Sequence, residues 1–186
     1  MSQVYVIAEI GINHNGNIDL AKELIFGAYQ SGCNAVKFQK RTINEVYTKK
    51  DLDRDRESPW GVTNRQQKEG LEFDIEQYKE LYEFAKNLNL EFIISCWDLK
   101  SIDLVEKHLD VDYHKVASAL ITDKTFLKKL NFTGKPVILS TGMCTPRHIE
   151  AAVKLLDNVT YVLACTSTYP TNPEEVNLSH ITTLKK

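Results

Sequence analysis

Short apolar runs alternate along the chain with longer segments whose apolar residues recur at helical spacing. The runs predict buried strands, and the longer segments predict amphipathic helices. This pattern of a strand followed by a helix occurs six times, beginning with a strand at 4–7. The other five strands are expected at 35–39, at 92–97, at 113–118, within 136–142 together with a tight turn, and within 161–170 together with the exit from the strand.

Several of the expected helices carry start signals. Asn17 is a candidate N-cap for the helix after the first strand. Asp74 and Gln77 have the spacing of a capping box, in which each side chain bonds the backbone N–H of the other residue. Thr145 before Pro146 combines an N-cap with a proline in the first turn. Helices are therefore expected to begin at these three places.

Residues 40–73 interrupt the alternation with a polar stretch of mixed charge and no sustained periodicity. Connections of this length are uncommon in a compact domain unless they form a lid or a binding loop. The segment 56–61 is the leading candidate for an ordered piece within this stretch, and most of the charges of the stretch are expected to be solvated.

The repeated unit predicts the fold class. Six strands each followed by a helix, without a GxGxxG sequence, favour a parallel α/β barrel over a dinucleotide-binding sheet. A TIM-type barrel closes with eight strands and takes roughly 250 residues. The 186 residues of this chain are therefore expected to form one domain, an incomplete TIM-type barrel with about six of eight β/α units.

Polar side chains at the ends of the expected strands are the candidate site. Parallel barrel strands all point the same way, so their carboxyl ends meet around one mouth. The catalytic candidates there are Glu9, Lys37 and Lys115. The substrate-binding candidates are Asn13, Gln39, Ser95, Ser118, Ser140, Ser167 and Tyr169. Two lysines among hydroxyls suit a small polyanion such as a phosphorylated carboxylic acid.

Lys37 lies within a short apolar strand, between Val36 and Phe38. A charge there is costly unless the ammonium reaches a partner or a ligand. The alternative is a side chain that extends outward to water. His14, near the end of the first strand, is expected to take part in hydrogen bonding within the first loop.

Composition excludes several classes of function. The chain is 42% hydrophobic and 26% charged, which is ordinary for a soluble globular protein. A net charge of −2 gives no electrostatic reason to expect nucleic acid or an anionic membrane as a partner. No bilayer-spanning run or signal peptide is evident, so a cytoplasmic location is expected. The separated cysteines are expected to be free thiols: Cys33, Cys96, Cys144 and Cys165.

Six motifs occur in order: AEIGINHNG at 8–16, AVKFQ at 35–39, ESPWG at 57–61, KVAS at 115–118, KPVILSTGM at 135–143 and CTSTYP at 165–170. With these motifs the chain resembles, essentially from end to end, the N-terminal barrel of the sialic acid synthase family. That family contains N-acetylneuraminate synthase and related nonulosonate synthases.

The resemblance implies condensation of phosphoenolpyruvate with an N-acetylated aldose, such as N-acetylmannosamine, and release of phosphate. It also implies a homodimer of the complete protein and a divalent metal, manganese or magnesium, that polarises the aldehyde. By analogy, Gln39 and Tyr169 would face the sugar, and Glu9 would position the sugar or move a proton. Phosphoenolpyruvate would be held by Lys37, Lys115, Ser118 and Ser140.

The chain also departs from the family pattern. Ala164 stands where many relatives carry a metal-binding histidine. Leu120 stands where sialic-acid-type members often carry an acid, which leaves the acceptor sugar open. The resemblance places a further metal-binding histidine and a small antifreeze-like domain beyond residue 186. Most of the metal ligands are therefore expected to be missing from 1–186.

Two other functions stay open. An incomplete barrel has unpaired first and sixth strands that invite pairing with another chain, as in a non-catalytic remnant or one part of a split barrel. The other alternative is a different barrel aldolase, with a Schiff base at Lys37 or Lys115.

Overall fold

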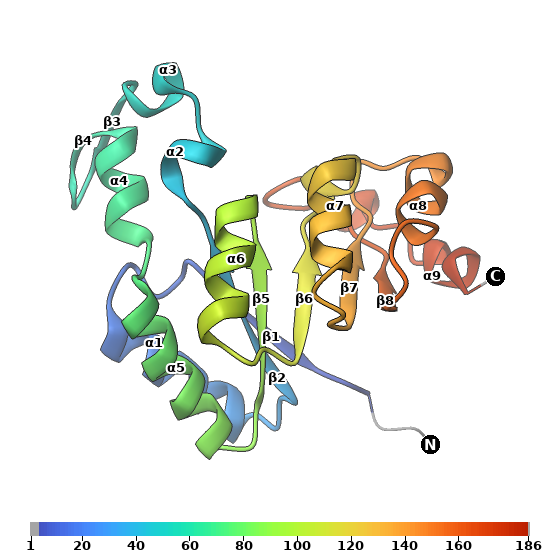
Figure 1. Ribbon diagram of the computed structural model, residues 1–186, viewed down its shortest axis with the longest axis horizontal. Coiled ribbons are helices and arrows are strands. Elements are labelled where there is room, and N and C mark those ends of the chain that lie inside the picture. The colour runs from blue at the N-terminus through green and yellow to red at the C-terminus, as the bar shows by residue number, and fades with distance from the viewer. Residues whose placement is uncertain (1–3, 186) are drawn as a thin grey trace. The chain divides into compact units, whose positions relative to one another are not determined.

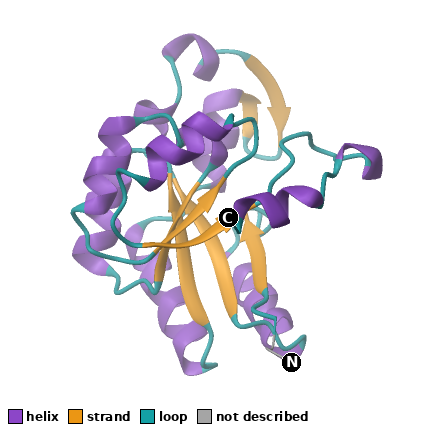
Figure 2. Cartoon of the chain, turned by 90° about the vertical axis from the view of Figure 1, so that its right-hand side faces the viewer, coloured by secondary structure: helices purple, strands orange, loops and turns teal. Residues whose placement is uncertain are grey.

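The computed structural model describes residues 4–185, which form two compact units that divide between Asp112 and Tyr113. Strands and helices alternate along the chain (Figure 1; Figure 2). The first unit has three parallel strands in the order β1 (Ile7–Gly11), β2 (Ala35–Lys40) and β5 (Glu91–Cys96). Its longer helices are α1 (Ile18–Gln30), α5 (Ile75–Asn87) and α6 (Leu99–His108).

The second unit also has three parallel strands, in the order β6 (Tyr113–Val116), β7 (Val137–Ser140) and β8 (Val159–Leu163). Its helices are α7 (Lys124–Asn131), α8 (Pro146–Val153) and α9 (Ser179–Leu184). Short 3-10 turns follow β6 and β8, at η1 (Ser118–Leu120) and η2 (Pro173–Glu175). Both units therefore contain the parallel β/α units predicted from the sequence.

The first strand differs from its prediction. Its apolar run was expected at 4–7, with the strand end just beyond, but β1 runs from Ile7 to Gly11. Val4 and Val6 are 77% and 44% exposed, so apolar character alone overstated their burial. Glu9 was expected at the C-terminal end of this strand, and it lies at the centre of β1.

The predicted helix starts are confirmed. The Asn17 side chain accepts from the Leu20 N–H at 3.0 Å. Asp74 and Gln77 form the reciprocal capping box, with bonds of 2.9 and 3.0 Å. Thr145 caps α8 with a proline in the first turn. No helix within residues 4–185 is long and apolar enough to cross a membrane.

An aromatic layer forms the core of the first unit, where α1 and α5 lie side by side (Figure 1). Phe38 of β2 and Phe92 of β5 stack with ring centroids 5.3 Å apart. Tyr78 of α5 meets Phe38 edge-on, and its hydroxyl donates to the carbonyl of Gln39. The phenol is therefore buried with its polar group satisfied, as close packing requires.

Apolar residues of one strand and one helix make the core of the second unit. The β7 residues Val137, Ile138 and Leu139 are buried. On α7, Phe126, Leu127 and Leu130 are spaced three and four apart and are buried as well. All four cysteines are free, and Cys96 is fully buried, which matches the sequence prediction.

The polar stretch 40–73 is folded along most of its length, and the segment 56–61, the expected ordered piece, lies in its two-stranded antiparallel sheet. It contains α2 (Ile43–Val46), α3 (Lys49–Leu52), the antiparallel strands β3 (Asp55–Ser58) and β4 (Gly61–Thr63), and α4 (Asn64–Leu71). We call this stretch the excursion. Its elements are too short to give a sustained hydrophobic period, which explains why the sequence pattern did not reveal them.

The excursion packs closely against the first loop at two glycines and a tryptophan. Gly16 has φ +67°, and a Cβ added there would lie 1.9 Å from the carbonyl oxygen of Gly70. A Cβ on Gly70 would lie 2.1 Å from the ring of Trp60. Both contacts require glycine. Gly16 and Trp60, which belong to two of the six motifs, therefore serve packing.

A buried histidine makes a second contact between the same segments. His14 is 1% exposed and stacks on Phe73 with ring centroids 4.1 Å apart. Its Nδ1 accepts from the Gly16 N–H at 3.1 Å, which confirms the predicted role in the first loop. Burial lowers the pKa of His14 to about 4.

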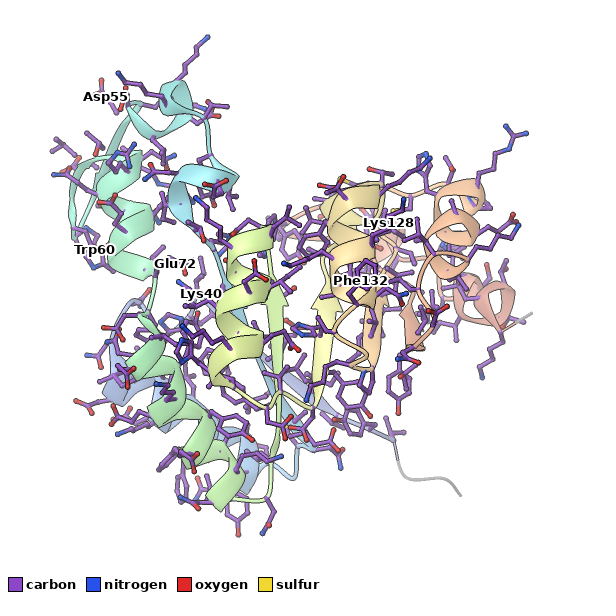
Figure 3. All side chains as sticks on the ribbon, in the orientation of Figure 1. Lys40, Asp55, Trp60, Glu72, Lys128 and Phe132 are labelled. Carbon is purple, nitrogen blue, oxygen red and sulfur yellow. The ribbon has the colours of Figure 1, made fainter. Side chains whose placement is uncertain are left out.

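The Glu72 carboxylate, at the end of the excursion, binds residues at its start. The Lys40 ammonium donates to Glu72 Oε2 and to the Phe73 carbonyl, each at 3.1 Å (Figure 3). The Arg41 N–H donates to the same Glu72 oxygen at 3.2 Å. The chain therefore leaves and rejoins the sheet at one charged, hydrogen-bonded point.

Gly16→Ala should lower the free energy of unfolding by about 2 kcal/mol or more, because it adds a clash with the Gly70 carbonyl to the strain of a positive φ. Gly32→Ala is the matched control, since Gly32 has φ +73° but open space around it. It should cost only about 1 kcal/mol. Urea unfolding of both variants is the measurement, and equal losses would contradict the packing contact.

The pKa of His14 predicts a pH-dependent stability. An unfolded histidine titrates near 6.5 and the folded one at about 4, so the unfolded state binds more protons between these values. The His14 contribution should be complete above pH 6.5 and should fall by at most about 3 kcal/mol as the pH drops to 4. His14→Asn keeps a hydrogen-bond acceptor but removes this titration. Urea unfolding from pH 7 to 4.5 should therefore give a flatter curve for the variant; parallel curves would refute the assignment.

Candidate functional site

Four predicted site residues share one face of the first unit's sheet. Glu9 of β1 is the register partner of Lys37 in β2, and Gln39 of β2 is the partner of Ser95 in β5. Lys37 and Gln39 are two residues apart, and side chains two apart on a strand point to the same face. Strand register thus brings together an acid, a lysine, an amide and a hydroxyl.

Lys37 has an acidic partner. Its side chain is 3% exposed, and its ammonium lies 2.6 Å from the Glu9 carboxylate. The Glu9 side chain is itself 50% exposed. The structure therefore resolves the question left by the sequence: the buried ammonium is paired with a carboxylate rather than extended to water.

Gln39 is held by a residue that sequence reasoning missed. The Arg41 guanidinium donates to the side-chain oxygen of Gln39. On the other side, a Cβ at Gly11 would lie 3.5 Å from Gln39 Nε2, so the β1 backbone approaches this amide closely. The sequence contained one clue to this role: Arg41 follows Gln39 by two residues and comes directly after the last residue of β2.

Asn13 joins Glu9 at a cavity beside β1 and α1. The cavity has a volume of about 400 Å³, and its lining includes Glu9, Asn13, Leu24 and Ser31. Asn13 itself is exposed. A small molecule in this cavity would therefore contact Glu9, the acidic partner of Lys37.

In the second unit, Lys115 and Ser140 share one face. Lys115 of β6 is the register partner of Ile138 in β7, and Ser140 lies two residues beyond Ile138. Ser140 is 3% exposed, and its hydroxyl makes no hydrogen bond to any described residue. Buried hydroxyls are nearly always satisfied, so this one is suited to a ligand.

Ser118 and Ser167 meet at Gly142, just after β7. The Gly142 N–H donates to Ser118 Oγ at 2.9 Å. A Cβ on Gly142 would lie 2.1 Å from Ser167 Oγ and 3.0 Å from Ser118 Oγ. Only a glycine therefore leaves room for both hydroxyls. Sequence analysis placed a strand end here but did not identify Gly142 as a site residue.

A second cavity, also of about 400 Å³, lies among the C-terminal elements of the second unit. Its lining includes Thr166, Ser167, Glu175 and His180. Tyr169 is not part of this lining and is 93% exposed. The structure thus brings Ser167 into a cavity but leaves Tyr169 at the surface.

The described residues do not fit a metal site. Within 4–185, no group of three His, Cys, Asp or Glu side chains is placed to hold a metal ion. Ala164, in the lining of the second cavity, offers no side-chain ligand. The metal implied by the family resemblance stays a prediction.

Glu9→Gln should destabilise the chain by about 1–3 kcal/mol, because it leaves the buried Lys37 ammonium without its counter-charge. The cost is below that of a fully buried pair because Glu9 is half exposed. Lys37→Met in the Glu9→Gln background should restore part of the loss. Urea unfolding of the wild type, both single variants and the double variant gives the coupling, and strictly additive losses would contradict the pair.

Comparison with known proteins gives consistent relatives. A model of the NeuB family matches residues 24–186. N-acetylneuraminate-9-phosphate synthase of Drosophila melanogaster is 36% identical, over 100% of this chain and 51% of that protein. N,N'-diacetyllegionaminic acid synthase of Campylobacter jejuni is 36% identical, over 100% of this chain and 58% of that protein. The chain thus spans about half the length of the curated relatives it matches.

A solved structure agrees with these sequence matches. The N-acetylneuraminic acid synthetase of Leptospira borgpetersenii superimposes with a TM-score of 0.85 and 29% identity, over 99% of this chain and 61% of that one. The predicted TIM-type barrel class is thereby confirmed. With a family model matched over most of its length and the same fold in a solved relative, the chain belongs to the NeuB family.

Proposed function

We propose that this chain carries the site that condenses phosphoenolpyruvate with an N-acetylated aldose, giving a nonulosonic acid and phosphate. The observation that carries the proposal is the ion pair between the buried Lys37 and the half-exposed Glu9, on the same sheet face as Gln39 and Ser95. Family membership supports it, because relatives are named as sialic and legionaminic acid synthases.

Lys37 and Lys115 are the cations proposed to bind phosphoenolpyruvate, with the hydroxyls of Ser118 and Ser140. Charge-assisted hydrogen bonds to a carboxylate or phosphate are stronger than neutral ones. The buried Ser140 hydroxyl would gain a partner on binding. Glu9 is half exposed, so a ligand anion that replaces it at Lys37 leaves the displaced carboxylate in water.

The proposed reaction balances in two steps. The enol carbon of phosphoenolpyruvate bonds to the aldehyde carbon of the sugar, and the aldehyde oxygen takes up a proton to become a hydroxyl. Water then adds to the oxocarbenium carbon and loses a proton. The new hydroxyl gives up its proton to the departing phosphate as the C–O bond breaks, which releases phosphate and leaves a ketone. Glu9 is the proposed proton carrier, and Gln39 orients the aldose from the same face.

The remaining predicted residues are assigned to the sugar side of this reaction. Asn13 lines the cavity next to Glu9, which supports a role in holding the aldose. Ser95, Ser167 and Tyr169 stay proposed substrate contacts. The names of the relatives differ in whether the product carries a 9-phosphate, so this function leaves open whether the acceptor is phosphorylated.

Lys37→Met and Lys115→Met should each weaken phosphoenolpyruvate binding by roughly 10–100-fold, the value of one charge-assisted hydrogen bond. Binding is measured by isothermal titration calorimetry. Phosphate release with N-acetylmannosamine, with and without manganese, is measured alongside it. Sugar-dependent release from the unaltered chain should fall in both variants.

Lys124→Met is the matched control, because Lys124 is an exposed lysine at the start of α7. It should leave binding and release unchanged. The proposal fails if the Lys37 and Lys115 variants bind and turn over phosphoenolpyruvate like the control. Trapping of a lysine adduct by borohydride would instead support the Schiff-base alternative.

A further inference from the structure

Arg41 holds the side chain of Gln39 from the position just beyond β2. Its guanidinium donates to the side-chain oxygen of Gln39. Another guanidinium nitrogen lies 3.7 Å from Glu72 Oε1, and the Arg41 side chain is 12% exposed. The guanidinium carbon lies over Trp97, 4.5 Å from the ring centroid. An aromatic face and a carboxylate thus restrain Arg41, and through Arg41 they restrain Gln39.

The chemistry of the guanidinium fixes which way the Gln39 amide faces. Arginine is always protonated and carries only hydrogen-bond donors, so it binds the oxygen of an amide and not its nitrogen. A Cβ on Gly11 would lie 3.5 Å from Gln39 Nε2, so the NH2 group faces β1. The reversed amide would bring two donors together. It would also forfeit a charge-assisted hydrogen bond worth roughly 10–100-fold in an equilibrium constant.

The backbone around Gln39 is already fixed by other contacts. The Tyr78 hydroxyl donates to the Gln39 carbonyl, and the Trp97 N–H donates to the Lys40 carbonyl at 3.0 Å. Strand pairing with β1 and β5 fixes the register of Gln39 on both sides. The terminal torsion of a glutamine has two broad minima of similar energy. The contact with Arg41 is therefore what selects one face of this amide over the other.

We propose that Arg41 is a positioning residue, which holds Gln39 so that its NH2 group donates a hydrogen bond to an oxygen of the acceptor sugar. The inference rests on the proposed function, in which Gln39 orients the aldose. The hydroxyl, aldehyde and N-acetyl carbonyl oxygens of an N-acetylated aldose can each accept this bond. A fixed donor favours ligands with an oxygen at that point, because without one the donor stays unpaired.

Arg41→Met should raise the KM for N-acetylmannosamine by roughly 5–10-fold, the cost of ordering one long side chain on binding. The KM for phosphoenolpyruvate and kcat should stay within about twofold, since only sugar binding is weakened. Phosphate release is the assay. Arg41→Lys also has only donors at its tip, so it should recover most of the loss.

Arg54→Met is the matched control, because Arg54 is another arginine of the excursion with a side chain that is 74% exposed. It should change neither KM. An unaltered sugar KM in Arg41→Met would overturn the inference, and so would an equal rise in Arg54→Met.

Variants of Gln39 separate positioning from a structural role of Arg41. In a Gln39→Leu background, Arg41→Met should raise the sugar KM by no more than about twofold, because Arg41 acts through the amide. A rise as large as in the unaltered chain would mean that Arg41 acts through the fold of the excursion. Gln39→Glu keeps the shape and the bond to Arg41 but offers only acceptors, so the sugar KM should rise at least about tenfold. An unchanged KM in Gln39→Glu would show that the sugar does not need the NH2 group.

Nuclear magnetic resonance of the free chain separates this inference from the function beneath it. The Gln39 NH2 protons should show a nuclear Overhauser effect to the α-protons of Gly11, and Gln39→Leu identifies the signal by its loss. The effect should weaken in Arg41→Met and persist in Arg41→Lys. Its absence from the unaltered chain would overturn the inference, whatever the activity. Its presence without any sugar-dependent phosphate release would support the positioning of Gln39 by Arg41 and contradict the proposed function.

Discussion

Two lysine ammonium groups are buried on the same strand, β2, and on opposite faces of it. Lys37 and Lys40 are three residues apart, so the alternation of a strand directs them to opposite sides. A buried ammonium is tolerated only when paired and hydrogen-bonded. Glu9 supplies the carboxylate on one face and Glu72 on the other. The candidate chemistry follows from the first pair, and the attachment of the excursion follows from the second.

The excursion depends on the second pair because its own elements are too short to be stable alone. Lys40 binds Glu72 and the Phe73 carbonyl, and so fixes the residue at which the chain returns to the sheet. That return places Phe73 against His14, and it places Gly70 against Gly16. The ion pair thus lies next to the residues through which the excursion packs against the first loop.

Local patterns predicted the fold well. Strand runs, helix faces and caps are encoded within a few neighbouring residues, as at Asp74 and Gln77, so the parallel β/α order followed from them. The requirement for a partner at Lys37 was also local. The partner of Lys40 lies 32 residues away, and no period or motif connects Lys40 with Glu72. The contact of Ser167 with Gly142 likewise joins distant segments, so only the folded chain reveals it.

Arg41 connects the two faces that β2 otherwise separates. Its backbone N–H is bound to Glu72, with the excursion, while its guanidinium packs on Trp97 and reaches the amide of Gln39. Gln39 lies on the face of Lys37, and Glu72 binds Lys40 on the other. The orientation of the Gln39 amide therefore depends, through Arg41, on the position of the excursion relative to β2. A polar insertion with no evident periodicity thus contributes to the site through a single side chain, because Arg41 stands at the point where the strand ends and the insertion begins.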